Sequence, residues 1–282
     1  MDRAERVTGI LAAEATPQAT IPIQATIERV AARVSGVSVY FGPGPDSWRL
    51  AADIVDSPAA VNDLLDEVCR LYEMDNRQVA ASFLVLGYFW HIMAAATACY
   101  LLENRVPDLS AGAIALDLRG GITFLSPHCW ALPGDPDAQH PTVTVVANQQ
   151  ELRERLTSQF EEHAAPLFAT LRSVAPYGLN GMRANYADRL ASAVIWIAEQ
   201  VGDLDLARRE VPALVSLARP NGRTGILEVE HAGRSGIFLN RGGCCLNYRL
   251  PGREKCDTCC LRPLEERIAL CRAYLEGNGQ IH

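Results

Sequence analysis

The sequence predicts a helix-rich α+β protein with antiparallel hairpins and a small cysteine-bearing segment at its C-terminus. Long stretches carry apolar residues at helical spacing, and short alternating runs occur in pairs separated by turn residues. Five of the nine cysteines fall between residues 244 and 260. The 282-residue chain is 49% apolar and 21% charged, which is typical of a globular protein that buries a core. This composition excludes a wholly disordered or fibrous protein.

The first predicted region, residues 1–147, mixes helices with short strands. Ser57 and Pro58 are an N-cap followed by proline at the first helical position, so a helix begins there. The runs 111–118 and 121–125 flank Arg119-Gly120 and predict an antiparallel hairpin, and residues 127–139 predict a loop. The full set of expected elements here is helices over 23–34, 58–73 and 79–102, and strands over 37–41, 111–118, 121–125 and 142–146.

The second predicted region, residues 148–239, is helical with a short hairpin, and the third, residues 240–282, is the cysteine-bearing segment. Pro166 predicts a kink or a break within the helical stretch 148–174. The other expected elements are helices over 181–201, 203–217 and 263–275, and strands over 225–230 and 235–239.

Residues 79–102 form a stretch of 24 residues without a formal charge. That length can cross a bilayer, but the flanking charges show no positive-inside bias. A helix that is apolar on all sides is also typical of the centre of a helical layer. We therefore expect a buried core helix, with a membrane span as the alternative, and we do not predict membrane association.

The N-terminus has four charged residues among its first six and no apolar stretch of a secretory signal, so we expect a cytoplasmic protein. In a reducing compartment, clustered cysteines bind metal more often than they form disulfides. The net charge of −7 argues against a nucleic-acid partner.

The clustered cysteines have a regular spacing. Cys244 and Cys245 are adjacent, ten residues follow, and Cys256 and Cys259 form a Cys-x-x-Cys pair with Cys260 next to it. Four thiolates can hold tetrahedral zinc or a [2Fe–2S] cluster. The adjacent pair favours the cluster, because neighbouring side chains point apart on extended backbone and two irons are a wider target than one ion. Zinc and unliganded thiols remain open from the spacing alone.

The motif Cys-Cys-x10-Cys-x2-Cys, with Tyr-Arg-Leu at residues 248–250, resembles that of the FhuF-type ferric siderophore reductases. Upstream, residues 162–167 and the helix 181–196 are similar to the helical stretch that precedes the cysteines in that family. This chain has Arg-Ala-Asn at residues 183–185, where the family often has Trp-Gly-Asn. The resemblance covers residues 155–272.

The resemblance implies that Cys244, Cys245, Cys256 and Cys259 hold a [2Fe–2S] cluster and that Cys260 is not a ligand. It also implies an oxidoreductase of iron acquisition, a ferric-siderophore reductase. Such a protein reduces the Fe(III) of a siderophore, here of the hydroxamate type, by one-electron transfer and releases Fe(II) in the cytosol. The electrons would come from an external donor such as a ferredoxin.

Basic residues gather around the cysteines. Residues 219–272 hold ten basic and six acidic side chains, a net charge of +4, so the rest of the chain carries −11. Arg241, Tyr248 and Arg249 are therefore candidate contacts for a ferric chelate, although cations here also offset thiolate charge. No dinucleotide-binding glycine loop or Walker A motif occurs, so we expect no nicotinamide, flavin or ATP site. An iron or redox sensor without turnover and a zinc-stapled binding module are the alternative functions.

The sequence also predicts where three other residues lie. His91 and Trp196 are expected in the core. His163 is expected on a solvated helix face, with a place in the substrate site as the alternative.

Overall fold

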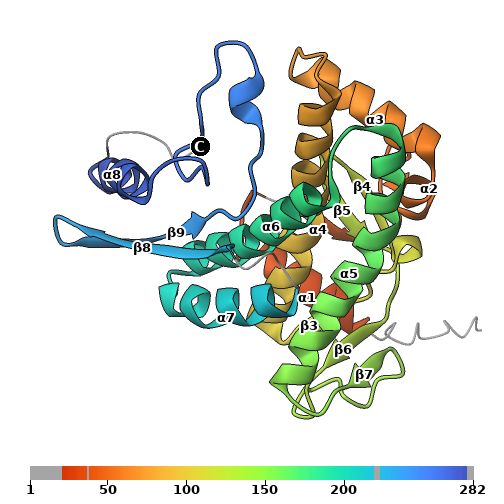
Figure 1. Ribbon diagram of the computed structural model, residues 1–282. Helices are drawn as coiled ribbons and strands as arrows, with labels where there is room; N and C mark the ends of the chain where they lie inside the picture. The colour runs from red at the N-terminus through yellow and green to blue at the C-terminus, as the bar shows by residue number, and fades with distance from the viewer. Residues whose placement is uncertain (1–20, 37, 219–222, 278–282) are drawn as a thin grey trace, which may run out of the picture.

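The computed structural model describes residues 21–36, 38–218 and 223–277, and its body is arranged around one long helix (Figure 1). This helix, α4 (Arg77–Glu103), contacts α1 (Pro22–Ala31), α3 (Pro58–Leu71), α5 (Gln149–Val174) and α6 (Leu179–Val201). The helices predicted from the sequence are all present, with ends shifted by a few residues. The remaining helices are α2 (Ala52–Val55), α7 (Leu204–Leu217), α8 (Leu264–Leu275) and the 3₁₀ turns η1 (Ala111–Ala113) and η2 (Asn247–Arg249).

The local sequence defines both ends of α4. The Asn76 side chain accepts hydrogen bonds from the backbone N–H groups of Gln78 and Val79, and Asn104 closes the helix in a left-handed conformation with φ 51°. Within the described ranges, α4 is the one helix long and apolar enough to cross a membrane, but 78% of its most apolar window is buried inside the protein. In this structure α4 is the core helix that the sequence predicts.

Two small sheets flank the helices. The first has the order β1-β5-β4-β2, from β1 (Val39–Phe41), β5 (Gly121–Phe124), β4 (Ile114–Asp117) and β2 (Arg49–Leu50). The predicted β4–β5 hairpin is confirmed, with Ile114 opposite Phe124, whereas β1 pairs with β5 in parallel. The second sheet has the order β3-β6-β7, from β3 (Arg105–Pro107), β6 (Cys129–Ala131) and β7 (Val143–Val145).

The sequence did not predict α2, β2, β3 or β6. The expectation of a loop throughout 127–139 is wrong for β6, which pairs with β3 and β7. These elements are only two to four residues long, too short for a periodic pattern, and long-range pairing rather than local preference makes the three strands regular.

Of the kink or break expected at Pro166, the break is absent, since α5 is a single helix of 26 residues. Proline removes only the hydrogen bond to the carbonyl of Glu162, and the buried face of α5 stays packed. The residues on that face include Leu152, Leu156, Phe160, Leu167 and Leu171. Tertiary packing thus outweighs the local penalty.

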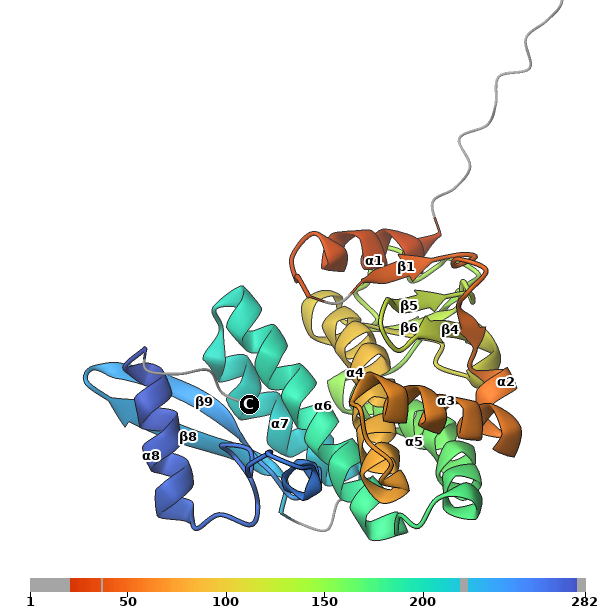
Figure 2. The ribbon, with the colours of Figure 1, turned by 90° about the horizontal axis from the view of Figure 1, so that it is seen from above.

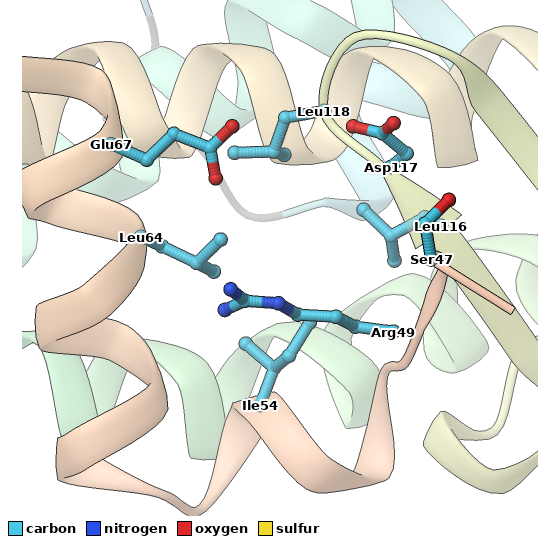
Figure 3. A pocket seen from close by; sticks show the side chains of 8 residues that line it. All are labelled: Ser47, Arg49, Ile54, Leu64, Glu67, Leu116, Asp117 and Leu118. Carbon is cyan, nitrogen blue, oxygen red and sulfur yellow. The ribbon is translucent and has the colours of Figure 1, made fainter. Parts of the chain in front are cut away.

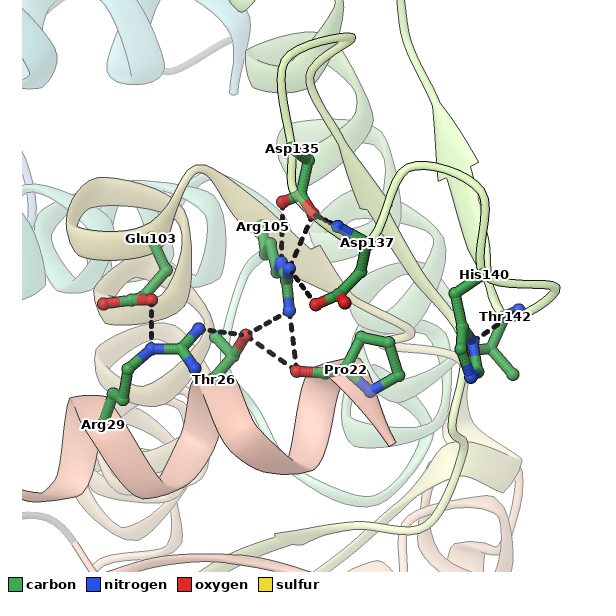
Figure 4. A network of polar contacts seen from close by, with 9 residues as sticks. All are labelled: Pro22, Thr26, Arg29, Glu103, Arg105, Asp135, Asp137, His140 and Thr142. Atoms are coloured by element: carbon green, nitrogen blue, oxygen red, sulfur yellow. Dashed lines mark hydrogen bonds and ion pairs between the residues drawn. The ribbon is translucent and has the colours of Figure 1, made fainter. Parts of the chain in front are cut away.

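A buried ion-pair network joins α1 to the second sheet (Figure 4). Arg105 is 2% exposed, and its Nη2 lies 2.6 Å from carboxylate oxygens of both Asp135 and Asp137. Its Nη1 donates to the Pro22 carbonyl at 2.8 Å and to the Thr26 hydroxyl at 3.0 Å. Because these partners satisfy the guanidinium, we interpret Arg105 as a structural residue.

The C-terminal part extends from the far side of α6 and α7 (Figure 2). It consists of the predicted antiparallel hairpin β8 (Gly225–His231) and β9 (Arg234–Asn240), with α8 packed on it. A small apolar cluster of Val229, Phe238 and Cys271 joins α8 to the hairpin. The residues of the main core run from Ile23 to Leu250 and lie on both sides of the predicted boundary at residue 147. The division into three regions stays a prediction.

Candidate metal centre

The cysteine-bearing segment leaves β9 at Asn240 and lies directly on the backbone of α6. A Cβ atom at Gly243 would lie 2.9 Å from the backbone nitrogen of Asn185, and one at Gly242 would lie 2.9 Å from the backbone nitrogen of Thr224. A side chain at Gly243 would push the segment away from α6, and one at Gly242 would push it away from Thr224. The two glycines therefore permit the close approach that brings Cys244 and Cys245 to the helical body.

Asp188 of α6 fixes this contact. Its carboxylate accepts hydrogen bonds from the backbone N–H groups of Gly242 at 2.8 Å and Gly243 at 3.0 Å, and from the Thr224 hydroxyl at 2.7 Å. Arg241 Nε lies 3.5 Å from the same carboxylate, which is 1% exposed. Burial raises the pKa of Asp188, and Arg241 and the three donors oppose that rise. The carboxylate thus connects α6 to the residues that precede the first cysteine pair.

Two side chains from neighbouring helices hold the backbone of the adjacent cysteines. The Ser82 hydroxyl on α4 donates to the Cys245 carbonyl at 3.0 Å. The Asn185 amide on α6 donates to Ser82 at 2.9 Å and lies 3.5 Å from the Cys244 carbonyl. Asn185 is the one residue of Arg-Ala-Asn that matches the Trp-Gly-Asn of the family that this chain resembles, so the sequence held one clue that Asn185 supports the cysteines. It contained none for Ser82 or Asp188.

Interactions among the sulfur atoms link the two halves of the motif. Cys260 raises the pKa of Cys244, and Cys256 lowers the pKa of Cys245. Among the described residues, no three side chains of His, Cys, Asp or Glu gather around a single-ion position. The adjacent thiols of Cys244 and Cys245 suit a centre with two irons better than one tetrahedral zinc that needs four sulfurs around it.

Through their mutual contacts, the pKa values of Cys245 and Cys260 are lowered and those of Cys244 and Cys256 are raised, so the surroundings favour negative charge on one sulfur of each contact. The Cys256 contact, Arg241 and a backbone N–H group lower the pKa of Cys245, although burial opposes them. Arg241 Nη1 lies 3.9 Å from the Cys256 sulfur. The backbone N–H of Leu246, which has a left-handed φ of 62°, donates to the Cys244 sulfur at 3.4 Å. The site thus has the cation and N–H donors that stabilise a thiolate-bound cluster, and its donor set fits a [2Fe–2S] group.

Cys259 and Cys260 occupy different environments. The backbone N–H of Cys259 donates to the Cys256 carbonyl at 3.1 Å, so the Cys-x-x-Cys segment is a closed turn. Cys259 is 2% exposed, whereas Cys260 is partly exposed and contacts Cys244. The spacing favours Cys259 as the fourth ligand, and this sulfur contact favours Cys260.

The three predicted substrate residues have different surroundings. Arg241 is 13% exposed and directed at Asp188 and Cys256 rather than at solvent. Arg249 is exposed and donates to the Gln78 amide oxygen at 2.5 Å, beside a surface hollow of about 660 Å³. Tyr248 is half-buried on η2. Their contact with substrate stays a prediction.

The expectation that His163 lies on a solvated helix face is wrong. It is 3% exposed, with Nδ1 2.8 Å from the Leu109 carbonyl and Nε2 2.8 Å from the Tyr88 hydroxyl. Because a carbonyl can only accept, Nδ1 carries the proton and Nε2 accepts from Tyr88. Burial lowers the pKa of His163, which keeps the ring neutral. His91 is half-buried and has Nε2 3.1 Å from the Leu118 carbonyl.

A separate enclosed hollow of about 160 Å³ lies between α3 and the first sheet (Figure 3). Arg49 crosses it below Glu67, and none of the clustered cysteines lines it. Glu67 already pairs with Arg119 at 3.2 Å. This hollow is therefore not part of the thiol site.

Comparison with known proteins identifies the cysteine-bearing segment. Residues 241–261 match the family model of the FhuF 2Fe-2S C-terminal domain, and no curated protein and no solved structure matches the chain. The matched residues run from Arg241 to just past Cys260 and contain the interacting thiols described above. The segment is an FhuF-type domain, and its cofactor is a [2Fe–2S] cluster.

Proposed function

We propose that this protein is a ferric-siderophore reductase that reduces an Fe(III) chelate, of the hydroxamate type, and releases Fe(II). The FhuF 2Fe-2S domain carries this proposal, because that family is ferric siderophore reductase-like. The geometry supports it, since Cys244, Cys256 and Cys260 are partly exposed at the protein surface. A chelate can therefore approach the thiol site without opening the core.

We propose Cys244, Cys245, Cys256 and Cys259 as the cluster ligands. Cys244 and Cys245 are adjacent in the chain, and Cys245 interacts with Cys256 of the second half of the motif. Cys259 closes a tight turn with Cys256, and this turn preserves the two-residue spacing of the motif. Cys260 then lies beside the cluster as an unliganded thiol.

The chemistry needs no acid–base pair from the protein. When bound, the cluster supplies one electron at a time, and one electron converts the chelated Fe(III) to Fe(II), which oxygen ligands hold far less tightly. Asp188, Asn185 and Ser82 hold the backbone that presents the thiols. Arg241 and the Leu246 N–H group contact the sulfur atoms, and such contacts adjust the reduction potential.

The electron donor that we propose is an acidic redox protein such as a ferredoxin in the cytosol. Arg253 and Lys255 lie exposed in the loop between the two halves of the cysteine motif. Together with Arg249 they form a basic rim beside the site, which favours an acidic partner.

The test is a single-turnover reaction under anaerobic conditions. Chemically reduced protein is mixed with a ferric trihydroxamate, and absorbance follows cluster oxidation while an Fe(II)-specific chromogenic chelator follows product. We expect one Fe(II) for each cluster oxidised. An iron or redox sensor would give no stoichiometric Fe(II), and that result would overturn the proposal. The Cys245→Ser variant, which lacks a ligand, is the negative control.

A further inference from the structure

A groove runs along the outer face of α6, between the helical body and the C-terminal hairpin. It has a volume of about 470 Å³, within the usual range of small-molecule sites. Trp90 of α4 and Trp196 of α6 form one wall, with ring centroids 5.5 Å apart. Phe238 of β9 and Tyr274 of α8 form the other, with centroids 5.8 Å apart. Trp196, which the sequence placed in the core, is thus a half-buried groove residue.

Arg189 joins this groove to the cysteine site. Arg189 follows Asp188 on α6, and the two side chains make different contacts. Asp188 is hydrogen-bonded to Gly242 and Gly243, whereas Arg189 lines the groove. The Arg189 guanidinium lies over the Trp90 ring, 5.5 Å from its centroid, and interacts electrostatically with Cys245. Arg189 thus lines the groove one residue after Asp188, which holds the cysteine-bearing segment.

The Arg189 side chain also has unused hydrogen-bonding capacity. Its Nε is buried and has no hydrogen-bond partner among the residues that the structure describes. No carboxylate in the same residues forms an ion pair with its guanidinium. A buried donor without a partner costs free energy, and an oxygen atom of a bound ligand would remove that cost.

We propose that this groove binds the ferric chelate, with Arg189 donating to a chelate oxygen and the aromatic walls packing on its organic backbone. The assignment rests on the proposed reductase function and names where its substrate binds. The groove carries one cation, Arg189, and one carboxylate, Glu199, so it has no excess of positive charge. It fits a neutral chelate, in which three hydroxamates offset Fe(III), better than a highly anionic tris-catecholate.

The test separates binding from electron transfer. Calorimetry measures binding of the redox-inert gallium(III) trihydroxamate to the holoprotein and to its Arg189→Gln and Trp196→Ala variants. Arg155→Gln is the matched control, because Arg155 lies over Trp130 at 4.8 Å in the same kind of contact but outside the groove. We expect Arg189→Gln to weaken binding roughly tenfold, equivalent to about 1.4 kcal/mol. Trp196→Ala should weaken it similarly, Arg155→Gln should not change it, and a gallium tris-catecholate should bind less well.

Each outcome is decisive when combined with the visible spectrum and the single-turnover reaction. Unchanged binding by both groove variants, with wild type still oxidised by the ferric chelate, overturns the groove assignment alone. Weakened binding by the groove variants with an unchanged cluster spectrum supports the groove assignment, whether or not wild type is oxidised. Wild type that binds the gallium chelate but is not oxidised by the ferric chelate overturns the reductase function alone. Wild type that neither binds gallium chelate nor is oxidised by the ferric chelate overturns both. Tighter binding of the tris-catecholate overturns the preference for a neutral ligand.

Discussion

The helical body and the cysteine-bearing segment of this protein are stabilised in different ways. The body surrounds α4, whose side chains are all buried or partly buried, and non-directional apolar packing holds it. The segment from residue 241 to 261 has one 3₁₀ turn, and Leu246 and Leu250 join it to the main apolar core. Hydrogen bonds with Asp188, Asn185 and Ser82 also hold it. Changes in the segment should therefore affect the cluster and leave the body folded.

The largest expected effect comes from removing a cluster ligand. In Cys245→Ser we expect loss of nearly all iron and acid-labile sulfide, because a neutral hydroxyl replaces the thiolate at the centre of the motif. Thermal unfolding followed by far-ultraviolet circular dichroism should show that the α-helical body still unfolds cooperatively. Loss of the helical signal in this variant would show that the helical body depends on the cluster for its fold.

The next effect distinguishes Cys259 from Cys260. We expect Cys259→Ser to lose most of its iron and Cys260→Ser to retain it, with at most a shifted visible spectrum. Iron content and absorption after anaerobic purification measure this. The reverse result would assign the fourth ligand to Cys260, in line with its contact with Cys244.

A smaller effect is expected from the glycine that packs on α6. Gly243→Ala places a methyl group 2.9 Å from the Asn185 backbone nitrogen, so the segment must shift, at a cost of about 1–3 kcal/mol. We expect reduced iron occupancy and a changed reduction potential. Gly225→Ala on the adjacent strand meets no atom within 4 Å and is the matched control. Equal occupancy in both variants would contradict the close-packing argument.

The smallest effect belongs to the body. Burial lowers the pKa of His163, so the unfolded chain binds its proton near pH 6.5 while the folded protein does not. Stability is therefore present above about pH 6.5 and falls as the pH drops below it, by at most about 1.4 kcal/mol per pH unit. Chemical denaturation at several pH values measures this slope. His163→Gln should reduce the slope, and an unchanged slope would contradict the assignment of a neutral buried ring.

The two regions also differ in how well the sequence predicts them. Apolar residues at helical spacing predicted α6 and α7, the Ser57-Pro58 cap predicted α3, and an uncharged stretch that is apolar on all sides predicted α4. The cysteine spacing favoured a cluster over zinc, and the resemblance of the motif to a known family predicted the [2Fe–2S] cofactor, which the family match supports. The short strands β3 and β6 were missed since distant pairing makes them regular.

The supports of the site were less predictable than its thiols. Asp188 and Ser82 are ordinary residues on helices, and only the fold brings them to Gly242 and Cys245. The residues around His163 do not reveal whether its face of α5 is exposed or buried, and only the structure shows that it is buried.

Iron and sulfide analysis of anaerobically purified protein, together with its visible spectrum, tests the central claim most directly. Thiols that hold a [2Fe–2S] cluster predict two irons and two acid-labile sulfides per chain and a reddish-brown protein with charge-transfer bands. A colourless protein with one zinc per chain and no sulfide would contradict it.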